Sequence, residues 1–143
     1  MFEKPILSPE VPGSHALNHN LNAGEQISIN GRLPHKKKNF DINLLSGSNI
    51  VLHISVRFEK DKKIVLNSLQ DNTWGFELSH ANNLHSDEQF ALQIRVYPTH
   101  FHVTCNGVLY GDFPHRQPFE NTQAISFGGV VIINSVQFER FAL

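Results

Sequence analysis

The chain of 143 residues has one cysteine, few charged residues and no long hydrophobic run. Its single cysteine, Cys105, excludes an internal disulfide and is typical of a reducing compartment. No apolar run approaches the ~20 residues of a membrane-spanning helix, so we predict no membrane insertion. The N-terminus lacks a basic start followed by an apolar block, which is the pattern of a signal peptide. We therefore predict a cytoplasmic protein, whose secretion to the extracellular space would be independent of a signal peptide.

The charge composition argues against a nucleic-acid partner. The formal net charge is -1, and charged residues make up 17% of the chain. A nucleic-acid-binding domain typically carries a clustered basic excess instead. The densest basic run, residues 36–38, is short enough for an ordinary solvated loop. We therefore predict no nucleic-acid binding.

A sustained helical spacing of apolar residues is also missing, and alternation of apolar and polar residues predicts short strands. Asn106-Gly107 is a typical type I′ hairpin turn between two of these strands. The chain is therefore predicted to be all-β, a sandwich of two antiparallel sheets with a core rich in phenylalanine. The predicted strands include residues 26–31, 39–44, 49–58, 64–69, 90–96, 101–104, 124–127 and 130–138.

We expect a single domain, because a chain of this length can bury one hydrophobic core and no linker or internal repeat interrupts it. Prolines and a glycine are concentrated at the start of the chain. This composition favours an extended N-terminal arm or edge strand over residues 1–14. The remaining residues, 15–143, are assigned to the globular domain.

A row of polar side chains follows one predicted strand. His53, Ser55 and Arg57 take alternate positions and therefore share one face. On the next predicted strand, 64–69, the apolar residues on either side of Asn67 are expected to face the core. Asn67 is then turned outward onto the same polar surface.

The only tryptophan lies shortly afterwards, in Trp74-Gly75-Phe76-Glu77. Trp74 and Glu77 would point to opposite faces of a regular strand, so a common surface requires a bulge or bend at Gly75. A flat aromatic ring beside a row of hydrogen-bonding groups suits a ligand that is polar at its rim and apolar on one face. Sugars are such ligands.

Each of these residues also has a purely structural explanation. A single tryptophan commonly lies in the core, and Arg57 and Glu77 could form a cross-strand ion pair worth under ~1 kcal/mol. His100 and His102 share one strand face among nine scattered histidines, yet no third ligand with fitting spacing accompanies them. We therefore predict no metal site and no other cofactor.

The ordered set of motifs resembles the galectin family of carbohydrate-recognition domains. The family pattern has a His-x-Asn-x-Arg strand, a Val-x-Asn strand and a Trp-Gly-x-Glu-x-Arg strand. This chain matches it at His53, at Arg57 and at residues 65–67 and 74–77. The resemblance spans nearly the whole chain, since similar flanking segments lie at residues 40–47, 113–116 and 135–138.

The resemblance implies a jelly-roll sandwich of two antiparallel sheets, the concanavalin-type lectin fold, which binds β-galactosides without metal. In the family, the histidine and arginine hydrogen-bond the axial 4-hydroxyl of galactose, the asparagine and glutamate reach the 6-hydroxyl, and the tryptophan stacks on the sugar. These roles correspond to His53, Arg57, Asn67, Glu77 and Trp74. The implied partners are galactose-containing glycans or glycoconjugates and, for a crosslinking lectin, a second copy of the chain in a homodimer.

Ser55 and Ser79 depart from the family pattern, which has asparagine and arginine there. Losing one charge-assisted hydrogen bond of ~1.5–3 kcal/mol weakens binding about ten- to a hundredfold. We therefore expect a metal-independent lectin for β-galactoside-containing glycans with weakened or altered specificity. Its predicted carbohydrate-binding residues are His53, Ser55, Arg57, Asn67, Trp74, Glu77 and Ser79.

Two other functions stay open at this point. A galectin-fold interaction or structural protein that has lost sugar binding would also explain Ser55 and Ser79. A glycan-processing enzyme would usually need two carboxyl groups flanking the scissile bond. Only Glu77 lies in the predicted site, so we expect no enzymatic activity.

Overall fold

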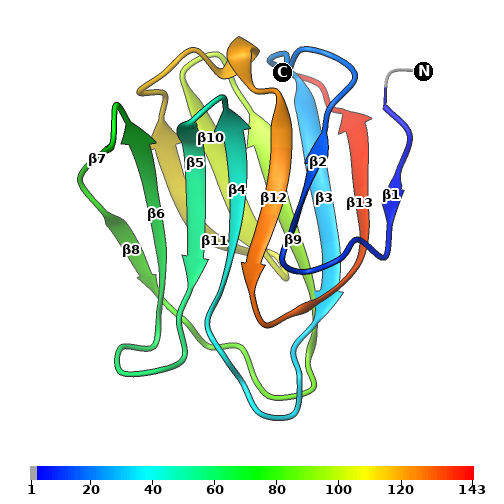
Figure 1. Ribbon diagram of the computed structural model, residues 1–143, viewed down its shortest axis with the longest axis vertical. Coiled ribbons are helices and arrows are strands. Elements are labelled where there is room, and N and C mark those ends of the chain that lie inside the picture. The colour runs from blue at the N-terminus through cyan, green and yellow to red at the C-terminus, as the bar shows by residue number, and fades with distance from the viewer. Residues whose placement is uncertain (1–2) are drawn as a thin grey trace.

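A computed structural model describes residues 3–143, and nearly all of its regular structure is strand (Figure 1). Within this part of the chain, the 3-10 turn η1 (Phe119–Asn121) is the only helical element, and no helix has the length and apolar character to cross a membrane. The strands are β1 (Ile6–Leu7), β2 (Gly13–Ala16), β3 (Glu25–Arg32), β4 (Phe40–Ser46), β5 (Asn49–Val56), β6 (Lys63–Gln70), β7 (Thr73–Trp74), β8 (Leu78–Ala81), β9 (Gln89–Val96), β10 (His100–Cys105), β11 (Val108–Pro114), β12 (Ala124–Gly129) and β13 (Ile132–Arg140).

The strands form two antiparallel sheets packed face to face, which confirms the predicted all-β sandwich (Figure 1). Sheet A has the order β1-β13-β3-β9-β10-β11. Sheet B has the order β2-β12-β4-β5-β6-β7, and β8 also pairs with β6. The N-terminal segment, expected to be an arm or edge strand, contributes β1 to the edge of sheet A and β2 to the edge of sheet B.

Alternating side chains along the strands build the core between the sheets. In β9, the large apolar side chains are buried and the residues between them remain partly exposed. The aliphatic residues contribute at least as much to this core as the aromatic ones, because isoleucine, leucine and valine fill most of it. The buried phenylalanines are Phe40, Phe90, Phe101, Phe113, Phe127 and Phe138.

The hairpin predicted at Asn106-Gly107 joins β10 to β11. Both turn residues have positive φ, 52° and 79°, as a type I′ turn requires. The hairpin places β11 at the edge of sheet A, facing β6 of sheet B, where a Cβ added to Gly111 would lie 2.9 Å from Leu66 Cδ1. The loop after β11 therefore starts beside the strands that carry the candidate site.

Two phenylalanines test the location of the core. Phe101 is fully buried, whereas Phe76 is 90% exposed. Phe101→Ala should lower the free energy of unfolding by about 3–5 kcal/mol, because it removes buried apolar surface and leaves a cavity. Phe76→Ala should change it by less than about 0.5 kcal/mol. Equal losses in urea denaturation would contradict this core.

Candidate functional site

The strand register places the polar candidates in rows across sheet B. Asn43, His53 and Asn67 are direct cross-strand neighbours on β4, β5 and β6. Ser55 and Val65 are neighbours in the next row. Residues that face each other across strands point to the same side of a sheet, so these side chains share the face turned away from the core, as predicted. Val65 is nevertheless fully buried there.

An extra residue in the neighbouring strand turns Trp74 and Glu77 to this same face. Trp74 of β7 pairs with Leu69 of β6, and Leu78 of β8 pairs with Leu66. Three residues of one strand therefore lie opposite two of the other, which reverses the alternation of the side chains. The bulge or bend that Trp74 and Glu77 need in order to share one face is therefore present between β7 and β8.

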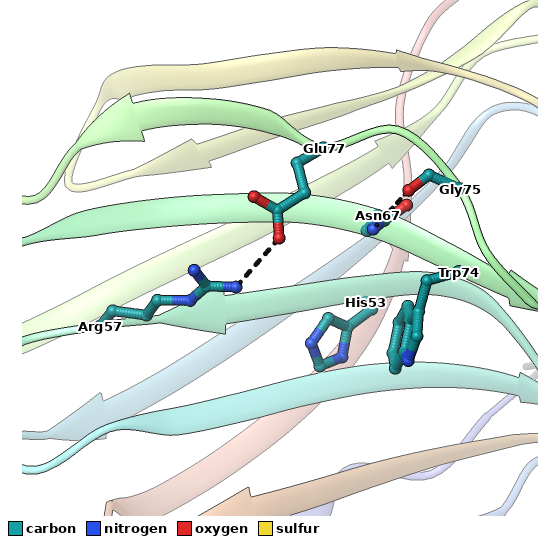
Figure 2. Close-up of a pocket in the computed structure, with 6 residues that line it drawn as sticks. All are labelled: His53, Arg57, Asn67, Trp74, Gly75 and Glu77. Carbon is teal, nitrogen blue, oxygen red and sulfur yellow. Dashed lines mark hydrogen bonds and ion pairs between the residues drawn. The ribbon is translucent and has the colours of Figure 1, made fainter. Parts of the chain in front are cut away.

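Six residues line a pocket of about 340 Å³ on this face (Figure 2). The indole of Trp74 is 49% exposed, so it is not a core side chain. Its ring centroid lies 4.8 Å from that of His53, with an interplanar angle of 56°. Five of the seven predicted residues converge here, whereas Ser55 and Ser79 do not line the pocket. The lining residues are His53, Arg57, Asn67, Trp74, Gly75 and Glu77.

His53 is held as a neutral ring with one defined tautomer. Its Nδ1 lies 2.5 Å from Asn43 Oδ1, while the Asn43 amide donates to Asp41 at 2.7 Å and Ser126 at 3.2 Å. Because the oxygen of Asn43 thus faces the ring, Nδ1–H donates to it and Nε2 remains an acceptor. Burial lowers the pKa of His53 below 6.5, with the charge of Asp41 opposing this shift and that of Arg57 adding to it.

Three side chains surround the guanidinium of Arg57. Its Nη2 donates to Glu77 Oε2 at 3.2 Å (Figure 2). Its Nε donates to Ser55 Oγ at 3.1 Å, and Nη1 lies 3.5 Å from Asp61 Oδ2. Ser55 therefore contacts the arginine instead of lining the pocket. The five N–H groups of a guanidinium leave donors for a ligand after these contacts.

Asn67 is buried, and its neighbours fill three of its four hydrogen-bonding positions. Oδ1 accepts from Ser68 N at 2.8 Å and from Arg116 Nη1 at 3.0 Å. Nδ2 donates to Gly75 O at 3.0 Å (Figure 2). Judged from the described chain, one N–H of Nδ2 is left, so Asn67 can act towards a ligand only as a donor.

Arg116, in the loop after β11, was not among the site residues predicted from the sequence. Its guanidinium nevertheless connects β6 to the chain between β7 and β8. Its Nη1 also donates to Ser68 Oγ at 3.2 Å, and Nη2 donates to Phe76 O at 2.7 Å. The guanidinium carbon lies 4.3 Å from the centroid of the Phe113 ring. In the sequence, Arg116 appears only as part of residues 113–116, one of the flanking segments that resemble the galectin family. Such a resemblance does not show which residues a long side chain contacts.

The carbonyl groups of residues 75 and 76 lie in the interruption between β7 and β8. The side chains of Asn67 and Arg116 donate to these carbonyls, and one backbone hydrogen bond, from Gly75 N to Ser68 O at 3.0 Å, remains in this stretch. A Cβ on Gly75 would overlap Nη1 of Arg116. Glycine is therefore needed at this position so that Arg116 can reach Asn67.

Ser79 lies on β8, opposite Val65 of β6, and is exposed. Because Ser79 lies two positions after Glu77, with only Leu78 between them, the two side chains point to the same side of the chain. The short serine side chain does not reach the pocket, where Glu77 accepts its hydrogen bond from Arg57.

The surroundings of Asp61 and Cys105 shift their pKa values in opposite directions. Burial acts to raise the pKa of Asp61, but the hydrogen bond with Lys63 and the charges of Lys63 and Arg57 outweigh it and lower that pKa. Asp61 is therefore a carboxylate at neutral pH and cannot be the protonated general acid of a glycoside hydrolase. Burial raises the pKa of Cys105 to about 11, so its thiol stays protonated at neutral pH.

Known proteins are similar to this chain over nearly its whole length. The sequence model of the galactoside-binding lectin family matches residues 12–138. Probable galaptin lec-8 of Caenorhabditis elegans is 41% identical over 137 residues, which cover 95% of this chain and 76% of that protein. The 32 kDa beta-galactoside-binding lectin of the same organism is 30% identical over 142 residues, 95% of this chain and 50% of that protein. The solved structure of C. elegans galectin LEC-6 has a TM-score of 0.84 at 25% identity, covering 95% of this chain and 96% of that one.

Arg116→Lys should loosen the segment that carries Trp74, because lysine keeps the charge but loses the fork that spans Asn67 and Phe76. Acrylamide should then quench the fluorescence of this single tryptophan more strongly than in the wild type. Arg95→Lys is a matched control, since Arg95 on sheet A also donates to a side chain and lies over an aromatic ring. Unchanged quenching in Arg116→Lys, or an equal increase in both variants, would contradict this role.

Proposed function

The chain belongs to the galactoside-binding lectin family, the galectins, and we propose that it is a metal-independent lectin for β-galactoside-containing glycans. One observation carries this proposal. His53, Arg57, Asn67, Trp74 and Glu77 converge in a single pocket on the polar face of sheet B. The same five residues match the sugar-binding pattern of the family, residue by residue.

The hydrogen-bonding state of each side chain suits the hydroxyl groups of one hexose. A hydroxyl group donates one hydrogen bond and accepts others. The 4-hydroxyl of galactose can donate to His53 Nε2 while it accepts from Arg57. The 6-hydroxyl can donate to the Glu77 carboxylate while it accepts from the remaining N–H of Asn67. Each pair of side chains thus offers one acceptor and one donor.

Trp74 supplies the apolar part of the binding surface. Its half-exposed indole borders the pocket beside His53. The C–H groups on one face of galactose are apolar, and a large flat ring can cover them and exclude water. A sugar placed in this way turns its polar rim towards His53 and Arg57 and its apolar face towards the indole.

The two serines support weakened binding. Ser55 is engaged with Arg57, where the family pattern has a longer asparagine. Ser79 lies outside the pocket. At its position the family pattern has an arginine, which braces the glutamate and contacts the second sugar. The contacts to a terminal galactose are therefore better preserved than those to the next sugar.

Calorimetric titration with lactose tests the proposal, and Ser79→Arg tests the cause of the weakening. The wild type should bind weakly, and Ser79→Arg should bind about ten- to a hundredfold more tightly, because it restores one charge-assisted hydrogen bond. Ser79→Ala is the control and should bind like the wild type. If neither the wild type nor Ser79→Arg binds lactose or any galactoside on a glycan array, the chain is a galectin-fold interaction protein instead.

Lactose affinity should depend on the protonation of His53. Because the pKa of His53 is lowered, a smaller fraction of it is protonated at any given pH than of an ordinary histidine, and only the unprotonated Nε2 can accept a hydrogen bond. Affinity should fall as the pH is lowered through the midpoint of the His53 ring signals in NMR, and this midpoint should lie below 6.5. A His53 midpoint above 6.5, or an affinity that does not follow the His53 midpoint, would contradict this assignment.

A further inference from the structure

Sheet A carries two histidines and an aspartate close together on its outer face, on the opposite side of the sandwich from the pocket. His100 and His102 alternate along β10 with the buried Phe101 and Val103. Asp112 of β11 lies directly opposite His102. One ligand atom from each of the two histidines and the aspartate lies within 4.8 Å of the others. The β10–β11 hairpin thus places Asp112 beside the two histidines, a neighbour that the sequence spacing did not reveal.

The three ligand atoms lie close together, and two of them contact each other directly. Nδ1 of His102 is hydrogen-bonded to Oδ1 of Asp112 at 2.5 Å, and Nε2 of His100 lies 3.6 Å from the same oxygen. In a tetrahedral zinc site with bonds of about 2.0–2.1 Å, neighbouring ligand atoms are about 3.3 Å apart. A bound ion would therefore replace the hydrogen bond between His102 and Asp112 and move these two side chains apart. We propose that His100, His102 and Asp112 bind one Zn²⁺ ion, with water in the fourth position.

Neighbouring side chains already orient His100 for ligation. Its Nδ1 lies 2.8 Å from the hydroxyl oxygen of Thr99. The Tyr97 ring stacks on the imidazole, with centroids 4.9 Å apart and an interplanar angle of 12°. When Nδ1–H donates to Thr99, the lone pair of Nε2 is available on the side of Asp112. Metal-binding histidines usually have such a partner on the second ring nitrogen, which fixes the tautomer.

The chemistry of the three ligands selects the class of metal. Two imidazole nitrogens and one carboxylate suit Zn²⁺ and its transition-metal neighbours, whereas Ca²⁺ and Mg²⁺ prefer oxygen ligands throughout. The carboxylate supplies one negative charge. Arg95, which lies across from His102 on β9, has its guanidinium bonded to Gln26 and placed over the ring of Phe141. Its guanidinium is thus held by other groups, while its positive charge remains beside the three ligands.

Calorimetric titration with zinc chloride tests the site on the full chain, prepared without a polyhistidine tag. The wild type should bind zinc, and Asp112→Asn should weaken binding at least tenfold because it removes the anionic ligand. Asp87→Asn is the matched control. Asp87 is also an exposed carboxylate bonded to a histidine Nδ1, that of His35 at 2.9 Å, but has no second histidine. This variant should bind zinc like the wild type.

NMR spectra of the histidine rings locate the bound ion. Zinc should shift the ring signals of His100 and His102 and leave those of His53 and His35 in place. The proposal is overturned if the wild type binds no zinc at millimolar concentration. It is also overturned if Asp112→Asn binds as tightly as the wild type, or if zinc shifts other histidines instead.

Discussion

The guanidinium of Arg116 connects the amide of Asn67 to the carbonyl group of Phe76, and the shape of the pocket depends on this connection. The extra residue between β7 and β8 turns Trp74 and Glu77 to one face, but it also breaks the strand ladder at that point. Hydrogen bonds to a charged group are worth ~1.5–3 kcal/mol each. Arg116 contributes such bonds from outside sheet B, so the packing of the two sheets contributes directly to the order of the pocket.

The pocket also depends on neighbours that leave each polar group with a single role. Asn43 fixes the tautomer of His53, and Asn67 retains one donor after its other bonds are made. Arg57 keeps donors beyond those used by Ser55 and Glu77. An arrangement of fixed donors and acceptors discriminates between hydroxyl groups of different orientation, because a mismatched hydroxyl leaves a polar group unpaired. Specificity is therefore expected from the pocket even where affinity is low.

The sequence predicts the fold well, because alternation defines most strands and Asn106-Gly107 defines one hairpin. It also predicts that His53, Arg57 and Asn67 share a face, since a period of two and a short connection are sufficient. The interruption that brings Trp74 beside them appears in the sequence only as a geometric requirement. Contacts such as that of Arg116 with Asn67 depend on strand register and on the path of a loop, and no local pattern encodes them. For the same reason, the sequence did not predict that Asp112 lies opposite His102, because this depends on the register of the β10–β11 hairpin.

The most direct test of a one-hexose pocket beside Trp74 follows the NMR signal of its indole N–H during titration with methyl β-galactoside and with its C4 epimer, methyl β-glucoside. The single tryptophan makes this signal unambiguous. A saturating shift with the galactoside and a much smaller one with the glucoside would support the pocket, because the proposed binding mode places an axial 4-hydroxyl, and not an equatorial one, between His53 and Arg57. An indole signal that moves with neither sugar, or equally with both, would contradict it.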